Sequence, residues 1–156
     1  FVTILVYFIL HRALGKAEEI HIAQPALTKA IKLLEKELPW HKMGIAHLTC
    51  GHIFKERTTE VIRLLPEKEL YNVFSLCSQK GVGIELNMKT LAMTDEEKSI
   101  LLRPYFIAKD CGCKFYLGSD AHKIEALETA KDNFENIVTL LDLEEKDKFV
   151  IGGKSK

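Results

Sequence analysis

Short apolar runs alternate with helical patterns along this chain, and this alternation constrains the fold more than any other feature of the sequence. The runs cover residues 2–10, 43–47, 81–87 and 114–118, and each has the length of a buried strand. At least one helical pattern separates each run from the next. Strands that are joined through helices pair in parallel, so the sequence predicts an α/β fold.

Proline, glycine and capping residues mark where the intervening helices begin and end. Pro66 suits the first position of a helix that ends at Gly81. Residues 94–97 read Thr-Asp-Glu-Glu, which matches a capping box, and Pro104 is expected to interrupt the helix that follows. After His122, apolar residues at helical spacing predict a long amphipathic segment directed towards a core: Ile124, Leu127, Ala130, Phe134, Ile137, Val138 and Leu141.

Length and charge bound the domain organisation and the partners. We expect residues 1–151 to form a single domain and residues 152–156, Gly-Gly-Lys-Ser-Lys, to be a flexible tail. The 22 basic and 22 acidic residues are interspersed and give a formal net charge of zero, so no nucleic-acid partner is expected. The apolar residues 1–10 are about half as long as a membrane-spanning helix, which favours a buried strand and no membrane partner.

The four cysteines indicate a reduced, cytoplasmic protein. Cys50, Cys77, Cys111 and Cys113 do not have the spacing of a zinc ribbon. Cys77 falls on the apolar face of a predicted helix, where a free cysteine packs as a small core residue. Cys111 and Cys113 flank Gly112, which is expected to end a helix, and packing roles are predicted for them too.

The strand predicted at residues 114–118 leads into Ser-Asp-Ala-His, which carries two metal-binding residue types. Side chains alternate along extended backbone, so Asp120 and His122 leave the same side if the strand conformation persists. A carboxylate and an imidazole suit zinc and other first-row divalent metals. The alternative is that Asp120 caps the helix after the strand and that His122 is exposed in its first turn. The residues alone leave both interpretations open.

Three motifs in this chain resemble those of the PHP family, named for polymerase and histidinol phosphatase. Residues 118–122, Gly-Ser-Asp-Ala-His, are similar to the family's C-terminal signature. Residues 44–47, Gly-Ile-Ala-His, resemble its strand that ends in a metal-binding histidine, and residues 83–87, Gly-Ile-Glu-Leu-Asn, resemble its Glu-Ile-Asn strand. They occur in the family's order, and the resemblance runs from about Met43 to the helix after His122.

The resemblance implies a metal-dependent phosphoesterase with a distorted, TIM-like barrel of seven strands and outer helices. Such an enzyme hydrolyses a small phosphorylated substrate with water that is activated by divalent ions, here zinc, manganese or iron. Asp120 and His122 then have catalytic and metal-binding roles. Within the family, this chain is most similar to the branch that resembles histidinol phosphatase.

Further site residues are expected at the carboxyl ends of the other strands, where α/β barrels carry their catalytic groups. The resemblance implies that His47 is a metal ligand; the alternative is a strand-end histidine that is hydrogen-bonded to a neighbouring loop. His11 follows the first apolar run without a distinctive motif, so a ligand and an ordinary surface histidine stand as equal alternatives. Glu85 and Asn87 share a strand face and are expected to orient the ligands.

The chain departs from the family pattern in what it lacks. It offers about four strand-helix units, and no His-x-His pair occurs anywhere in it. We therefore expect the C-terminal portion of the enzyme, a truncated TIM-like PHP barrel. This portion need not be active alone, and it is expected to self-associate through exposed barrel edges. The alternatives are a non-catalytic metal-binding or interaction module derived from such an enzyme, and a polymerase-associated PHP module.

Overall fold

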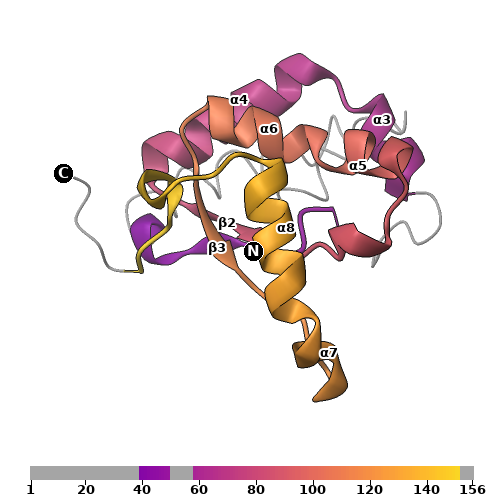
Figure 1. Cartoon of the computed structure of the whole chain (residues 1–156). Coiled ribbons are helices and arrows are strands. Elements are labelled where there is room, and N and C mark those ends of the chain that lie inside the picture. Colours follow the sequence, from indigo (N-terminus) through magenta and orange to yellow (C-terminus); the bar gives the residue numbers. More distant parts are fainter. Residues whose placement is uncertain (1–38, 50–57, 152–156) are drawn as a thin grey trace.

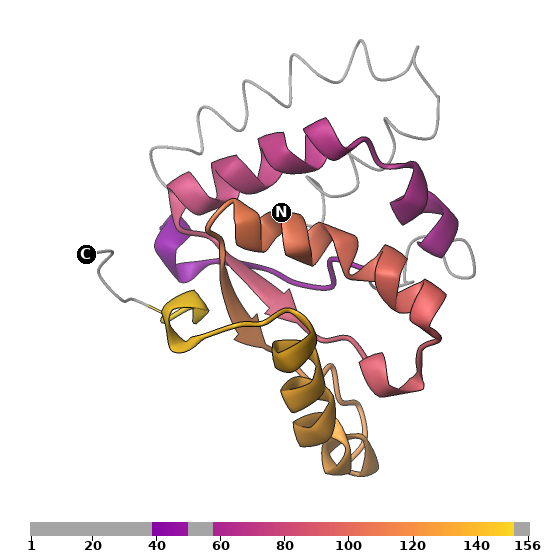
Figure 2. The same ribbon diagram turned by 45° about the horizontal axis from the view of Figure 1, so that its top comes forward.

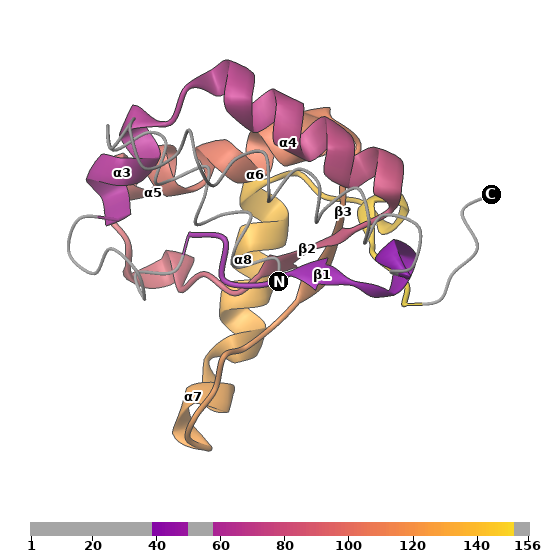
Figure 3. The same cartoon turned by 180° about the vertical axis from the view of Figure 1, so that it is seen from behind.

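A parallel sheet lies at the centre of the structure (Figure 1). The computed structural model describes residues 39–49 and 58–151. Within them, strand β1 is Gly44–Ile45, β2 is Gly83–Leu86 and β3 is Lys114–Leu117. The strands lie in the order β1-β2-β3, and both neighbouring pairs are parallel (Figure 3). Over the described residues the sheet is not closed into a barrel, and only a single parallel bridge, between Phe115 and Lys148, extends it beyond β3.

Three of the four predicted strands are confirmed, and the α/β fold is confirmed with them. Each strand is shorter than the apolar run that predicted it, because the ends of the runs leave the sheet to form turns. The fourth prediction, at residues 2–10, lies outside the described residues.

Helices alternate with the strands as predicted, and α4 and α6 run side by side above the sheet (Figures 1 and 2). In chain order the helical elements are η1 Trp40–Lys42, α3 Thr58–Leu64, α4 Glu67–Lys80, η3 Thr90–Ala92, α5 Asp95–Leu101, α6 Arg103–Asp110, α7 Glu125–Glu128, α8 Ala130–Leu140 and η4 Glu145–Asp147.

Helices α4, α5 and α6 begin and end close to the residues that the sequence marked as their boundaries. Thr94 and Glu97 form the capping box before α5, since the Thr94 side chain accepts from the Glu97 backbone and the Glu97 side chain accepts from the Thr94 backbone. Pro66 caps α4 from outside rather than opening it as predicted, because its ψ of 131° is extended. Gly81 ends α4 with a φ of 68°, a left-handed conformation in which glycine has no steric cost. The helix is interrupted at Leu102, and Pro104 is the second residue of α6, where a missing N–H costs nothing.

The prediction of a long amphipathic segment directed towards the core is wrong for its first part. The segment is divided at Thr129 into the single turn α7 and the longer α8. Ile124 is 80% exposed and Leu127 is 53% exposed, since α7 projects away from the sheet (Figures 1 and 3). Only further along does the apolar face reach the core, where Ile137 and Leu141 are completely buried.

The core lies against one face of the sheet. Ile45, Ile84 and Phe115 occupy the same level of the three strands and are at most 4% exposed. They belong to one apolar cluster with Phe74 of α4 and Tyr105 of α6. This packing holds the sheet rigidly against the helices, so the strand ends have defined positions relative to one another.

The opposite face of the sheet carries two glycines that make room for aromatic rings. A Cβ at Gly44 would collide with the ring of Tyr116, and a Cβ at Gly83 would lie 2.6 Å from the ring of Phe149. The two rings are themselves in contact, with centroids 5.9 Å apart. The glycines therefore let large side chains cover this face closely.

Buried thiols in the described core have raised pKa values, which makes the stability of the fold sensitive to alkaline pH. Cys77 is 5% exposed and Cys113 is 1% exposed, as predicted for packing residues, whereas Cys111 is partly exposed. Burial raises the pKa of Cys77 from its ordinary 9.0 to about 11, and that of Cys113 to about 12.

We expect the free energy of unfolding to fall as the pH rises above about 9, because the unfolded state ionises these thiols before the folded state does. The neutral thiols make their full contribution to the free energy of unfolding at pH values below the ordinary thiol pKa. That contribution is lost as the pH rises through the raised pKa values of the folded state. For Cys77 the loss is on the order of 2–3 kcal/mol. Urea unfolding at pH 8 and pH 10.5 under reducing conditions measures it. A Cys77→Ala/Cys113→Ala variant should show a flatter pH dependence, and equal slopes for the two proteins would contradict the prediction.

Candidate functional site

Polar side chains from the ends of all three strands meet at one edge of the sheet. His47 follows β1. Glu85 lies in β2, and Asn87 is the residue directly after this strand. Asp120 and His122 follow β3. In a parallel sheet the carboxyl ends of neighbouring strands lie at the same edge, which brings motifs far apart in the sequence together. The structure thus brings together five of the six residues expected at the site; His11 lies outside the described residues.

His47 is held at both its backbone and its ring. Its backbone N–H donates to Oε2 of Glu85 at 2.8 Å, and its ring Nδ1 lies 2.7 Å from Nδ2 of Asn87. Its φ of 57° is left-handed, an unusual conformation for a residue with a side chain. Its other ring nitrogen, Nε2, lies 3.8 Å from Oδ1 of Asp120. Asn87 lies directly after the end of β2, so this contact also agrees with the alternative of a strand-end histidine that is hydrogen-bonded to a neighbouring loop, and the ligand role of His47 stays a prediction.

One carboxylate oxygen lies between two imidazoles. Oδ1 of Asp120 is 3.8 Å from Nε2 of His47 and 3.5 Å from Nε2 of His122. The side chains of His47 and Asp120 are 40% and 31% exposed, while that of His122 is 84% exposed, so the group opens to solvent on the His122 side.

Asp120 and His122 approach each other, but not through the alternation of side chains along an extended strand that the sequence predicted. Strand β3 ends at Leu117, and Asp120 has a φ of 48°, so extended alternation does not reach these residues. A left-handed turn brings them together instead. The capping alternative is wrong as well, because the next helix, α7, begins at Glu125 with Ile124 as its cap.

Glu85 connects the three motifs through a buried carboxylate. The residue is 9% exposed, and its carboxylate passes so close to Gly118 that a Cβ there would collide with it. Gly118 therefore leaves the space through which Glu85 reaches the His47 backbone. Burial, together with the nearby charge of Glu85, raises the pKa of Tyr116 to about 12, so the phenol stays neutral beside the carboxylate.

The donor atoms around Asp120 have a spacing that suits a metal ion. Two ligands at about 2.0–2.1 Å from a tetrahedral zinc ion are about 3.4 Å apart, close to the two nitrogen–oxygen distances around Oδ1 of Asp120. Glu85 is already occupied by the His47 backbone, and within residues 39–49 and 58–151 no group of three or more His, Cys, Asp or Glu side chains is arranged to hold a metal ion. Each imidazole nitrogen thus lies at a distance from Oδ1 of Asp120 that a shared ion would allow, but among the described residues the three side chains together are not arranged to hold one.

Other polar residues considered from the sequence lie elsewhere. His41 is exposed in η1, whereas His21 and His52 lie outside the described residues. Arg103, a possible phosphate contact by charge alone, donates to the backbone oxygens of Ile62 at 3.1 Å and of Leu65 at 2.6 Å. It thus satisfies carbonyl groups at the end of α3, which is a structural role.

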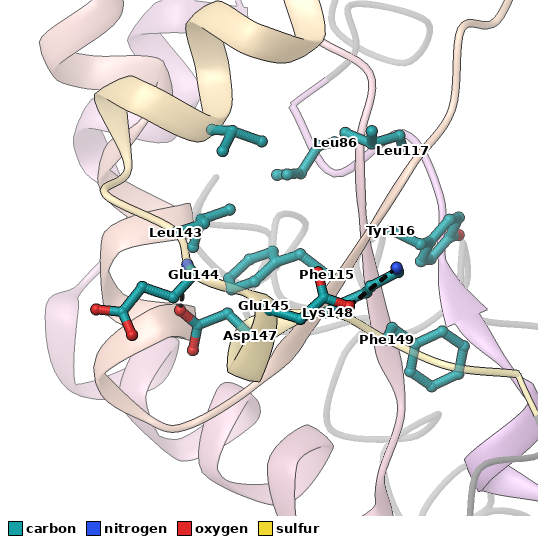
Figure 4. A pocket seen from close by; sticks show the side chains of 11 residues that line it. Leu86, Phe115, Tyr116, Leu117, Leu143, Glu144, Glu145, Asp147, Lys148 and Phe149 are labelled. Carbon is teal, nitrogen blue, oxygen red and sulfur yellow. Dashed lines mark hydrogen bonds and ion pairs between the residues drawn. The ribbon is translucent and has the colours of Figure 1, made fainter.

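A hollow of about 490 Å³ lies beside the outer edge of β3 (Figure 4). No sequence motif pointed to it, because its lining comes from separate elements that only tertiary packing brings together. The residues that meet at the strand ends are not part of its lining. Its wall is apolar and its rim charged, from Leu86, Phe115, Tyr116, Leu117, Val138, Leu143, Glu144, Glu145, Asp147, Lys148 and Phe149.

Removal of the Glu85 carboxylate should release His47. We expect Glu85→Ala to broaden or shift the His47 amide signal in NMR spectra, because the left-handed backbone loses its hydrogen bond. Glu85→Gln keeps an acceptor oxygen and should preserve the signal. Gly118→Ala should reproduce the Glu85→Ala effect with Glu85 still present, since its new Cβ displaces the carboxylate. An unchanged His47 amide in both Glu85→Ala and Gly118→Ala would contradict this connection.

No family model matches the chain, and comparisons with curated proteins and with solved structures find no match either. In the described ranges, 39–49 and 58–151, no helix combines the length and apolar character needed to cross a membrane. The family resemblance therefore rests on the three motifs at the strand ends.

Proposed function

We propose that this chain is the C-terminal portion of a PHP-family metal-dependent phosphoesterase, which hydrolyses a small phosphate monoester with metal-activated water. The observation that carries the proposal is the approach of His47 and His122 to one oxygen of Asp120. These residues come from two of the three motifs that suggested the family, and the third motif supplies the residues that hold His47.

The residues have distinct tasks in this mechanism. Asp120 and His122 would hold a divalent ion of zinc, manganese or iron, and His47 approaches the same oxygen of Asp120 as His122 does. The ion, when bound, polarises a phosphate oxygen and lowers the pKa of a bound water. Glu85 keeps His47 in place through its backbone, and Asn87 does so through the ring. His11 remains a predicted further ligand.

A truncated TIM-like barrel accounts for the open sheet. The carboxyl ends of the strands carry the polar group, as in barrel enzymes. Beyond β3, the backbone N–H of Phe149 donates to the oxygen of Phe115 at 2.7 Å, and Lys148 forms a parallel bridge with Phe115. Lys148 and Phe149 thus pair with β3 at a single position along its outer edge, next to the apolar hollow. Edges of this kind favour self-association.

We expect this function in a cytoplasmic protein with reduced thiols and without a nucleic-acid or membrane partner. The domain predicted over residues 1–151 and the tail predicted at residues 152–156 extend outside the described residues. The free thiols Cys77, Cys111 and Cys113 and the formal net charge of zero support this proposal.

A second candidate function is a metal-binding or interaction module without turnover. The absence of a His-x-His pair from the chain and the incomplete coordination sphere among the described residues favour it. A polymerase-associated module is the weaker alternative, because the balanced charge offers no attraction for DNA.

Metal uptake and turnover separate these functions. Purified protein is equilibrated with zinc, manganese or iron(II), its bound metal is measured by elemental analysis, and hydrolysis of p-nitrophenyl phosphate is followed. We expect stoichiometric uptake of at least one ion, and hydrolysis that depends on it supports the phosphoesterase. Uptake without hydrolysis favours the module. Failure to take up any of the three ions would contradict the phosphoesterase and a metal-binding module, and would leave an interaction module.

A further inference from the structure

A short run near the end of the chain repeats the residue pattern of strand β3. Residues 148–152 read Lys-Phe-Val-Ile-Gly, and residues 114–118, which contain β3, read Lys-Phe-Tyr-Leu-Gly. Valine and isoleucine are β-branched and favour extended backbone. Yet Val150 is 59% exposed and Ile151 is 76% exposed, and neither belongs to a strand. A run with the composition of a strand therefore lies beside the sheet without joining it.

The first two residues of this run already occupy the place of a fourth strand. Lys148 forms a parallel bridge with Phe115, and the backbone N–H of Phe149 donates to the oxygen of Phe115 at 2.7 Å. In that register Phe149 lies opposite Tyr116, so the two side chains should leave the same face of the sheet. They do, since their ring centroids are 5.9 Å apart and the Phe149 ring covers Gly83 on that face (Figure 4).

Beyond the bridge, the outer edge of β3 is open at Leu117. The backbone N–H of Gly118 donates to the oxygen of Leu86 in β2 at 3.1 Å, and alternate residues of a strand direct their backbone groups to opposite sides. The N–H and C=O of Leu117 therefore point away from β2. In the part of the chain that the structure describes, these two groups have no hydrogen bond on the outer side. Leu117 is 50% exposed, so another strand can reach them.

Continuing the register of the bridge would bring Val150 to the hollow. Val150 would lie opposite Leu117, with its side chain on the same face as those of Phe115 and Leu117. Both of these residues line the hollow of about 490 Å³, together with Leu86 and Val138. Val150 is not part of this lining in the described conformation. The hollow thus offers apolar contacts at the place where the register would put an apolar side chain that is now exposed.

We propose that residues 148–151 are a strap that closes onto the outer edge of β3 as a fourth parallel strand, with Val150 in the hollow, and that the described arrangement is its open form. Closing adds two hydrogen bonds, from Leu117 N–H to the Phe149 oxygen and from Ile151 N–H to the Leu117 oxygen. The strap is already held at the edge by Phe149, so it competes favourably with a second copy of the chain.

The strap regulates access to the edge of the sheet. An open strand edge pairs readily with another chain, and closing covers this edge. Self-association through the outer edge of β3 then requires the open form. This inference goes beyond the function proposed above, and it does not depend on the binding of a metal ion.

Hydrogen exchange at the Leu117 amide, followed by NMR, tests the strap. We expect this amide to exchange at least about tenfold more slowly than an unpaired amide, because closing places it in a hydrogen bond. Ile151→Pro removes the N–H that donates to Leu117, and Val150→Asp places a charge in the apolar hollow. Both variants should raise the exchange rate of Leu117 to that of an unpaired amide.

Each test variant has a matched control. In the proposed register the Val150 N–H points away from β3, so Val150→Pro removes no bond to the edge and should leave Leu117 slow. Ile124→Asp is the control for Val150→Asp, since Ile124 is 80% exposed and lies outside the hollow. Slow exchange of the buried Ile84 amide, in the middle strand, establishes that each variant is folded.

Three results would overturn the proposal. The first is a wild-type Leu117 amide that exchanges as fast as an unpaired one. The second is slow exchange that persists in a folded Val150→Asp variant, or equal rates in Ile151→Pro and Val150→Pro. The third is slow exchange that is lost on dilution, because a second copy would then occupy the edge in place of residues 148–151. We expect exchange that is independent of protein concentration.

Discussion

An Asp120→Ala/His122→Ala double variant is expected to bind zinc at least about 100-fold more weakly than the wild-type protein. Loss of a residue that only supports a ligand costs about 10–100-fold in metal affinity, and this variant removes two donors themselves. The variant removes the oxygen that both imidazoles approach and one of the two imidazoles, so His47 alone remains of these three side chains. Competition with a zinc-binding dye measures the affinity, and metal-dependent hydrolysis should fall with it.

The matched control for this variant is Asp142→Ala/His41→Ala. Asp142 has a φ of 50°, close to the 48° of Asp120, so both substitutions place alanine in a left-handed turn. His41 is exposed and lies outside the group. The control protein should retain wild-type zinc affinity. Equal affinities in the double variant and the control would show that the proposed ligands do not bind the ion.

Tyr105→Ala is expected to lower the free energy of unfolding by about 3–5 kcal/mol, the range for replacing a large buried aromatic residue. Tyr105 is completely buried in α6, within the cluster that holds the helices against the sheet. Its hydroxyl also lies 3.2 Å from Oγ1 of Thr49, two residues after His47. The substitution should therefore loosen the segment that follows β1 as well as the core. Chemical denaturation measures the change.

Two further variants separate the contributions of the ring and the hydroxyl. Tyr105→Phe removes the hydroxyl that lies 3.2 Å from Oγ1 of Thr49 and keeps the ring, and it should cost about 1 kcal/mol. Phe106→Ala changes the next residue, which is 43% exposed, and should cost much less than Tyr105→Ala. A Tyr105→Ala variant as stable as Phe106→Ala would mean that the helix is not packed as described.

Much of the fold could be predicted because its signals are local. The Thr94 capping box, the Gly81 helix end and the Pro104 interruption depend on residues a few positions apart, and each is confirmed. The amphipathic segment after His122 shows where local patterning fails. Apolar spacing predicts which residues share a helix face, but burial of that face depends on a neighbouring element, and Ile124 is 80% exposed.

The sequence predicted which of the described residues come together at the candidate site, but it did not predict how they are arranged. Strand-end positions placed His47, Asp120 and His122 at one edge of the sheet, as parallel pairing requires. The extended conformation expected for Asp120 was wrong, because nothing in Gly-Ser-Asp-Ala-His specifies the left-handed φ that the turn adopts. The role of Gly118 was also beyond sequence reasoning, since the group that it accommodates is Glu85, on the neighbouring strand.

The sequence by itself determined the order of strands and helices, their approximate ends and the end of the sheet at which polar residues gather. These properties follow from hydrophobic periodicity and capping, which act over one or two turns of chain. Only the tertiary structure decided that the Glu85 carboxylate passes Gly118 to hold the His47 backbone and that Asn87 faces the His47 ring. Such contacts join residues about 40 positions apart, and their distances depend on how the strands pack side by side rather than on any local pattern.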